Sequence, residues 1–327
     1  MQAIKADLPT TYSMQYLFNV QRELGANTVL EVGYDGNLSR HLGGLQNLNA
    51  AIPGTVGNVN SRTPFPQFGI IQTLANEGVG NYNGLGMKVT RRFHGGLTYL
   101  SSYTWSKSLD TTSANRGTTN DILPQNSRCL KCEYGFSAFD TPQRFVTSVL
   151  YELPFGRGKM FAGSANWLVN EVVGGWQVGS IVTWQSGHAL NTNAGSDRPG
   201  TGGNGEPRLN ATGISPNIDN HTSNQWFNPL AFALPDPGTF GNVSRNRLRG
   251  PSFINWHFST FKNFRVTEGR ALELRFESFN FANHPNRGDP NLNWGSTNAL
   301  KPGANFLTIN STANSMRQMQ IALKFVF

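Results

Sequence analysis

The sequence predicts an all-β protein whose antiparallel strands cross a membrane. Apolar residues recur at every second position in nine segments, which is the period of a β-strand rather than of a helix. The connections between these segments alternate between short and long along the chain. Charged residues make up 14% of the 327 residues, whereas a typical soluble domain has about 25%. A membrane-spanning strand needs only about 9–11 residues, so each segment is long enough to cross.

The overall composition excludes several other classes of protein. No run approaches the roughly 18 uncharged apolar residues of a membrane-spanning helix, and mean hydropathy is −0.38. The net charge is +8, but Lys and Arg are dispersed, with only short pairs such as Arg91 and Arg92. We therefore expect contact with anionic lipid head groups and no nucleic acid. The first ten residues contain no signal peptide, so we expect either a cytoplasmic chain or a missing natural beginning.

The alternation defines each expected strand. The nine segments are 11–24, 28–36, 82–93, 97–110, 143–154, 174–187, 253–266, 271–281 and 316–327. In the last segment, one side of the extended chain carries Phe327, Phe325, Leu323, Ile321 and Met319. In segment 271–281 the apolar phase slips after Phe276, as a β-bulge would cause.

The lengths of the connections indicate how the sheet is oriented. Long stretches lie at about 39–80, 109–142, 187–251 and 282–315, whereas the other turns are short or, at 154–173, of medium length. All long connections therefore meet at one end of a single region, 1–327. Outer-membrane barrels show this asymmetry between extracellular loops and periplasmic turns. A soluble Greek-key sandwich is not expected to sort its loops in this way.

The apolar side of such a sheet must be covered. The connections are rich in Gly, Asn, Pro, Ser and Thr, and no amphipathic helix is long enough to cover nine strands. We therefore expect lipid to cover this side. Aromatic residues near the strand ends suit the two girdles of a membrane barrel. The alternative is that they form the core of a soluble β-sandwich.

Five ordered blocks of the sequence resemble a known family. Segments 63–69, 81–110, 139–159, 174–190 and 253–286 are similar to the carboxyl-terminal barrel region of TonB-dependent outer-membrane transporters, of the Oar-like type. This resemblance implies part of a 22-stranded barrel in a Gram-negative outer membrane. It also implies that Phe327 ends a signal read by the barrel-assembly machinery, with Phe325, Leu323 and Ile321 on the lipid face of the same strand. Energy for uptake would be relayed by TonB through an amino-terminal plug.

The chain departs from the family pattern in three ways. No plug, no TonB-contacting box and only nine strands are recognisable. Because a barrel in lipid must close, we expect this chain to be a fragment or a truncated product. The alternative is a closed barrel of nine strands.

Motifs that carry chemistry are weak. Cys129 and Cys132 lack a second pair for a zinc site, and we expect a local disulfide. Segment 155–159 lacks the spacing of a phosphate loop and is expected to be a turn. By alternation, His257 faces the lumen, as do Glu273, Arg275 and Glu277, which form a polar ladder rather than the acid and base of a hydrolase. We expect no enzyme activity, cofactor or metal.

Three classes of function remain open. The favoured one is a receptor and transporter part, and its substrate is not predicted. The second is a surface adhesin that binds a glycan through 188–251, and the third is an extracellular β-sandwich hydrolase.

Overall fold

The computed structural model describes residues 1–25, 27–113, 123–203, 205, 207–267, 269–296, 298 and 301–327. Parts of the expected connections fall outside these residues. They are Ala26, 114–122, Asn204, Glu206, Glu268, Thr297 and 299–300.

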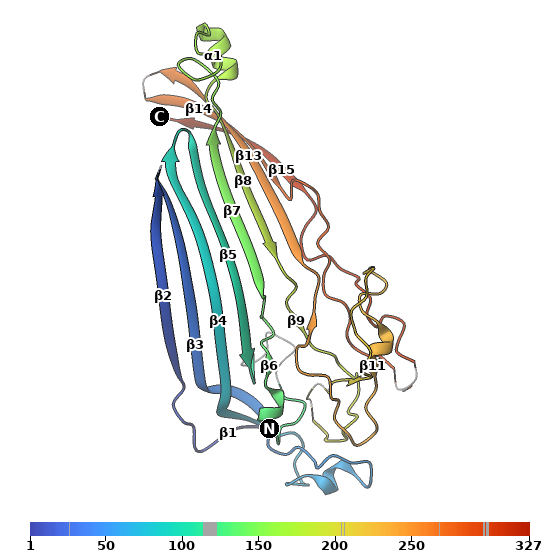
Figure 1. Ribbon diagram of the computed structural model, residues 1–327. Coiled ribbons are helices and arrows are strands. Elements are labelled where there is room, and N and C mark those ends of the chain that lie inside the picture. Colours follow the sequence, from blue (N-terminus) through green and yellow to red (C-terminus); the bar gives the residue numbers. More distant parts are fainter. Residues whose placement is uncertain are drawn as a thin grey trace.

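Nine long strands form one antiparallel sheet, as the alternation predicts (Figure 1). They are β2 (Tyr12–Gly25), β3 (Thr28–Asn47), β4 (Gln72–His94), β5 (Leu97–Asp110), β7 (Gln143–Glu152), β8 (Trp176–Gln185), β13 (Phe253–Thr267), β14 (Arg270–Phe279) and β15 (Gln318–Val326). Each strand pairs with the next of the nine along the chain, in the order β15-β14-β13-β8-β7-β5-β4-β3-β2. The all-β, antiparallel class is therefore confirmed.

Shorter strands and helical turns lie at the ends of the sheet and in the loops. Two short strands join it: β1 (Gln2–Ile4) pairs in parallel with β4, and β6 (Gly135–Phe136) pairs with β5. Two small ladders form within the loops, from β9 (Ala189–Leu190) with β12 (Leu248–Arg249) and from β10 (Asn210–Ala211) with β11 (Phe232–Ala233). The helical elements are α1 (Trp167–Val173) and three 3-10 turns, η1 (Val59–Arg62), η2 (Leu130–Glu133) and η3 (Pro229–Ala231). None of the helices in the described ranges is long and apolar enough to cross a membrane.

The two ends of the sheet differ in the way that the sequence predicts. The tight turns after β2, β4 and β13 lie at one end, together with α1 and the carboxyl terminus (Figure 1). We call this the short-turn end. The long connections 48–71, 111–142, 186–252 and 280–317 lie at the other, which we call the loop end.

The first long loop is shorter than the expected 39–80. Strand β3 continues to Asn47 and β4 begins at Gln72, with pairing maintained through shifts of register around Leu42. These extensions are rich in Gly and Asn and lack apolar alternation. Backbone hydrogen bonds hold them together, and a pattern of side chains does not reveal such bonds.

The bulge expected in segment 271–281 is not present, and that expectation is wrong. Strand β14 keeps one register with β15 from Ala271 to Phe279. The strand then ends, because Asn280 takes a left-handed conformation with φ of 51°. This turn brings the ring of Phe281 to 4.8 Å from that of Trp256. Phe279 still belongs to β14, pairs with Gln318 and lies on the face opposite Phe276, so no bulge separates the two rings. Only Phe281 is repositioned by the turn.

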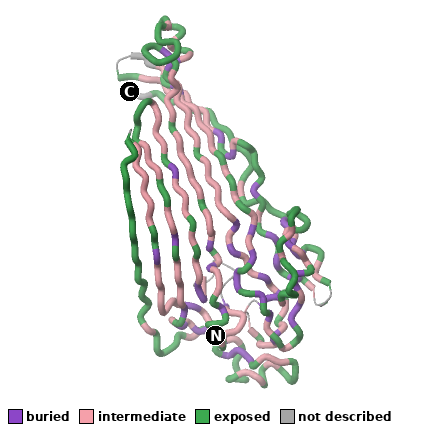
Figure 2. The backbone as a smooth tube through the Cα atoms, in the orientation of Figure 1, coloured by how far each residue is buried: buried purple, intermediate pink, exposed green. Residues whose placement is uncertain are grey.

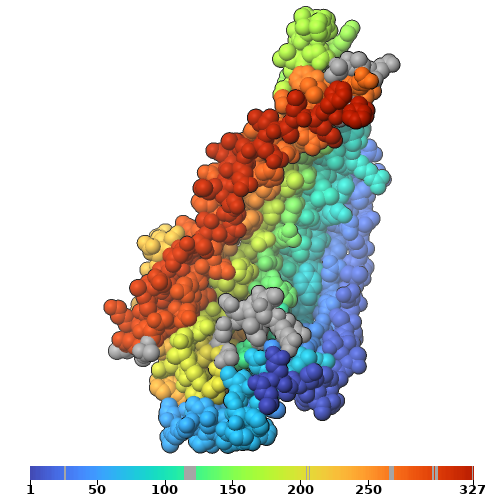
Figure 3. All heavy atoms as spheres, turned by 180° about the vertical axis from the view of Figure 1, so that it is seen from behind, coloured from blue at the N-terminus to red at the C-terminus, as the bar shows by residue number. Residues whose placement is uncertain are grey.

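The sheet is open at both edges. In the described residues β2 pairs only with β3, and β15 pairs only with β14. Seen from behind, the last part of the chain runs along one margin of the molecule and the first strands lie on the opposite side (Figure 3). Closure and a total of 22 strands stay predictions.

The hydrophobic core lies in the loops rather than on the sheet. Among the described residues, Ala75 is the only buried hydrophobic residue that belongs to the nine long strands. Buried positions gather around the loop end, while most of the sheet is of intermediate exposure (Figure 2).

Candidate functional site: the two faces of the sheet and the loop cap

Cross-strand pairing shows that the sheet has one apolar face and one polar face, because residues paired directly across antiparallel strands share a face. One row across seven strands consists of Val20, Val32, Met87, Tyr103, Phe145, Trp184 and Ile254. The adjacent row on the other face consists of Gln21, Glu31, Lys88, Ser102, Val146, Thr183 and Asn255. The pattern continues to the last strand, where Ile321 pairs with Phe276 and Gln320 pairs with Glu277.

Within the described chain, connections cover the apolar face only locally, where Gly174 lies over Lys262 and Phe281 packs on Trp256. On β15 the side chains of Ile321, Leu323 and Phe325 are exposed, with Ile321 at 74%. Phe327 follows the strand and is 93% exposed. Pairing of β15 with β14 places Ile321, Leu323 and Phe325 on the apolar face. The contact of this face and of Phe327 with lipid stays a prediction. Their role as an assembly signal stays a prediction.

The predicted polar ladder lies on the opposite face and is internally paired. Arg275 forms an ion pair with Glu273, and its guanidinium lies 5.5 Å from the ring centre of Phe261. Glu277 accepts a hydrogen bond from Gln320 on β15. Each of the three charged groups therefore has a neighbour that stabilises its charge.

His257 lies on the same face. Its Nδ1 accepts a hydrogen bond of 3.3 Å from the backbone N–H of Asn280, and its Nε2 lies 3.2 Å from the side chain of Asn255. The ring packs against Phe279 at 5.5 Å. Both nitrogens thus have hydrogen-bonding partners. A search of the described residues finds no group of side chains suited to hold a metal ion.

A polar recess of about 800 Å³ opens on the polar face at the loop end. Strands β2 to β5 form its wall, and Gln15, Asp35 and Tyr82 line it together with Ser108 and Asp110. Amide, carboxylate and hydroxyl groups therefore border a space large enough for a small-molecule ligand.

The long loops fold into a unit with its own core, which we call the loop cap (186–252 and 280–317). Its core combines side chains from both loops: Ala194, Leu209, Phe227, Ala231, Phe232, Leu234, Val243 and Leu248 from the first, and Leu292, Trp294, Phe306 and Leu307 from the second. Phe306 packs on both Phe232 and Trp294, with ring centres 6.0 and 5.2 Å apart.

Three arginines of loop 186–252 anchor this cap to β5 and to the connection that follows it. Arg245 bonds to Asp110 at 2.7 Å, and both side chains are almost fully buried. Arg208 bonds to Glu133 at 2.5 Å, again out of contact with water. The third pair, Arg249 with Asp140 at 2.6 Å, is partly exposed on the arginine side. Charge-assisted bonds of this kind fix the cap in one position over the sheet.

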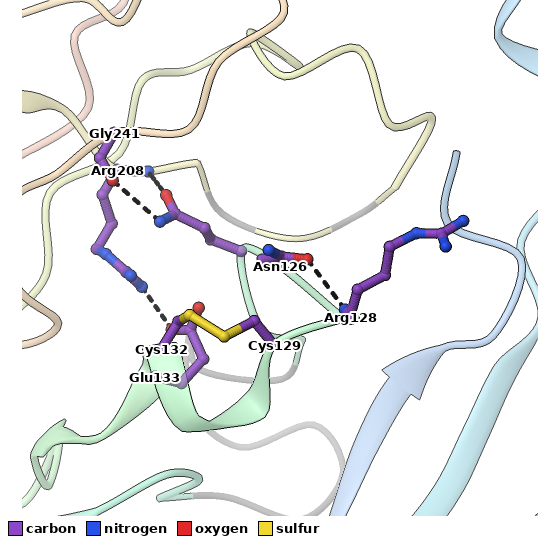
Figure 4. Close-up of a disulfide and its surroundings, with 8 residues drawn as sticks. Asn126, Arg128, Cys129, Cys132, Glu133, Arg208 and Gly241 are labelled. Atoms are coloured by element: carbon purple, nitrogen blue, oxygen red, sulfur yellow. Dashed lines mark hydrogen bonds and ion pairs between the residues drawn. A yellow bond between two sulfur atoms is a disulfide. The ribbon is translucent and has the colours of Figure 1, made fainter. Parts of the chain in front are cut away.

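The two cysteines lie beside one of these anchors. Cys129 and Cys132 form a disulfide across η2, directly before Glu133 (Figure 4). The side chain of Gln125 connects the same region to the cap, since it accepts from the backbone N–H of Arg208 and donates to the carbonyl of Gly241. The disulfide therefore closes the turn that presents Glu133 to Arg208.

A weaker contact joins the two loops of the cap. His188 Nε2 lies 3.1 Å from Asp289 Oδ2. The hydrogen bond with Asp289 raises the pKa of His188 above its ordinary value, which outweighs the opposing effect of partial burial. At neutral pH a larger fraction of this imidazole is charged than in an unpaired histidine.

The sequence did not reveal the arginine anchors. Arg245 and Asp110 are separated by 135 positions, and no local periodicity links residues so far apart. The signal that was available is the occurrence of several arginines in a loop otherwise rich in Gly, Asn and Pro.

The antiparallel sheet has one apolar face, one polar face and long loops at one end. This combination is typical of a membrane β-barrel protein. The family described as "Outer membrane beta barrel domain" matches residues 1–320. The chain belongs to this family, and its location is the outer membrane.

Among solved structures, the outer membrane transporter YddB from Escherichia coli is similar to this chain, with a TM-score of 0.49 and 11% sequence identity. The alignment covers 98% of this chain and 33% of that protein, so the chain spans about a third of the transporter's length. No curated protein gives a significant match.

Proposed function

We propose that the chain forms nine consecutive strands in the wall of a TonB-dependent outer-membrane transporter of the Oar-like type, and that it takes part in the active uptake of a substrate. The observation that carries the proposal is the two-faced sheet. Its apolar face is continuous across the strands and exposed, while the polar face opposite would line an aqueous interior. The resemblance of segments 81–110, 139–159 and 253–286 to these transporters supports TonB dependence.

The open edges support a larger barrel. Strand β2 is exposed along all of its 14 residues, and β15 has a free edge as well. In lipid, each unpaired backbone group would cost several kcal/mol. In this proposal, further strands of the same protein pair with both edges and close the wall.

The proposal assigns a role to each surface. The apolar face contacts outer-membrane lipid, and the barrel-assembly machinery reads the strand that ends at Phe327. The loop cap and the polar recess meet the substrate first, because both lie at the loop end. TonB acts through a plug, and neither nucleic acid nor a catalytic step is involved.

Energy dependence tests this function. Cells that express the complete reading frame are given a defined nutrient mixture, and depletion of each compound from the medium is followed by mass spectrometry. We expect at least one compound to be depleted only when both TonB and the proton-motive force are intact.

Retention of a compound at the cell surface without TonB or the proton-motive force would instead indicate an adhesin or glycan-binding protein. That result, or depletion that an uncoupler does not affect, would overturn the proposal. A variant with Asp35→Asn in the polar recess should deplete the same compound more slowly while reaching the membrane in equal amount.

A further inference from the structure

The connection between β7 and β8, residues 153–175, exposes a cluster of apolar side chains at the short-turn end. Helix α1 has the sequence WLVNEVV, and its Leu168 and Val172 are 58% and 69% exposed. Met160 and Phe161 add further exposed apolar surface to the same connection. This clustering requires a partner, because isolated apolar residues on a surface are ordinary but a contiguous group is not.

The connection is well ordered by its own hydrogen bonds. The side chain of Asn166 caps α1 by accepting from the N–H of Val169. The side chain of Asn170 accepts from the N–H of Arg157 at 2.6 Å, which attaches segment 155–163 to the helix. Gly156 lies close to Gly174, since a Cβ atom added to Gly156 would be 2.7 Å from the Cα atom of Gly174. The apolar side chains are therefore held outward by a fixed framework.

The connection also leans toward the apolar face of the sheet. Lys262 occupies a position on that face, paired with Trp176 on one side and Leu274 on the other. Its ammonium group donates to the carbonyl of Gly174, at the end of α1. Only 2% of Lys262 is exposed, and its charge lies 5.8 Å from the ring centre of Trp176. The indole N–H of Trp176 in turn donates to the carbonyl of Val172.

Charges of both signs border this apolar cluster, with Glu171 in α1 itself and two cations in segment 155–163. Arg157 and Lys159 are exposed within the connection, and Lys159 also lies 3.4 Å from Glu152. On the apolar face, Arg22 and Arg91 occupy the outward positions nearest the tight turns of their strands. Cationic side chains next to an apolar surface are typical of segments that lie in the head-group layer of an anionic membrane.

We propose that the β7–β8 connection is an interfacial anchor that binds the phospholipid leaflet at the short-turn end. The apolar side chains of α1 enter the boundary between head groups and acyl chains, and the Arg157 guanidinium contacts lipid phosphate. Lipid is the expected partner because the cluster is continuous with the apolar face, which the outer membrane already covers. The anchor depends on the membrane location of the chain and not on substrate uptake.

A fluorescent probe at the helix tests the anchor. Because the two cysteines form a disulfide, a Leu168→Cys variant offers one thiol for labelling with the environment-sensitive dye NBD. The labelled chain is reconstituted in vesicles of phosphatidylethanolamine and phosphatidylglycerol at 3:1, and quenching by lipids spin-labelled near the head group is measured. We expect a blue-shifted, quenched signal at residue 168.

Matched probes separate this inference from the membrane assignment itself. A probe at Ile321→Cys on the apolar face should be quenched, and one at Val56→Cys at the loop end should stay in water. A water-exposed probe at 168 with a quenched probe at 321 would overturn the anchor and leave the membrane sheet intact. Water-exposed probes at both positions would overturn the anchor and the membrane sheet together.

The charge contribution is tested in the same system. Arg157→Gln should lower the ratio of lipid-bound to water-exposed probe at residue 168 by about fivefold, as expected for one cation near an anionic surface. In the chain that retains Arg157, replacing phosphatidylglycerol by phosphatidylcholine should lower this ratio by more than Arg157→Gln does. An unchanged ratio in both tests would exclude an electrostatic contact between Arg157 and the anionic head groups.

Discussion

Replacing Ile321 by Arg distinguishes lipid from water as the surroundings of the apolar face. Within the chain, the Ile321 side chain is already 74% exposed, so the substitution removes little packing. If water surrounds this face, the change should cost less than about 0.5 kcal/mol. In a bilayer the same Arg lies in mid-strand among acyl chains and should destabilise the folded state by about 2–4 kcal/mol.

Gln320→Arg is the matched control, because residue 320 is on the polar face and pairs with Glu277. The new cation would form an ion pair worth about 0–1 kcal/mol, so the variant should unfold much like the unmodified chain. Urea unfolding in phosphatidylcholine vesicles, followed by tryptophan fluorescence, measures both variants. Equal stability of the two would contradict the assignment of the faces.

Three further predictions concern the loop cap. Arg245→Met leaves Asp110 buried without its cation and should weaken the attachment of the cap by about 3–5 kcal/mol. The loss should be seen as faster amide exchange in 186–252. Unchanged exchange would show that this ion pair is not needed to hold the cap. Phe227→Ala opens a cavity in the core of the cap and should lower the unfolding free energy of the cap by about 3–5 kcal/mol. The unfolding transition is followed by near-ultraviolet circular dichroism. Simultaneous unfolding of the sheet would show that the cap and the sheet do not unfold separately. The raised pKa of His188 means that its contact with Asp289 contributes fully below the unfolded-state pKa of about 6.5 and is lost as pH rises through the higher folded-state pKa. Because both groups are partly exposed, the effect should be at most about 1 kcal/mol. Amide protection factors near residue 289, which are corrected for the intrinsic rise of exchange with pH, should fall over that pH range but not in His188→Asn.

Alternation of side chains predicted the strands well wherever one face is apolar. Segment 143–154 became β7 (Gln143–Glu152), and segment 174–187 became β8 (Trp176–Gln185), with boundaries within two residues. The extensions of β3 and β4 were not predicted, since their many Gly and Asn residues pair in the ladder without an apolar alternation. The bulge predicted in 271–281 was wrong because Phe279 is an aromatic residue on the polar face of a regular strand, and Phe281 follows the turn at Asn280.

The arrangement of the loops could not be predicted from the sequence. Each anchor joins residues from different connections, as Arg208 does with Glu133 across 75 positions. Such pairs depend on how the sheet places its loops, and a period of two contains no information about that placement. The polar ladder on β14 was predictable, in contrast, because Glu273, Arg275 and Glu277 follow the strand period.

The distribution of burial explains why these two parts obey different rules. In water, a sheet with this much apolar surface would be stabilised by covering it, yet the chain places its compact core in the loops and leaves the apolar face free. The loops face water and therefore need a core of their own, with buried ion pairs to hold it to the sheet. In the proposed membrane arrangement, the strands need only satisfied backbone bonds and an apolar exterior, since lipid would supply the rest of their environment. The same residue types are thus buried at one end of the molecule and exposed along the sheet.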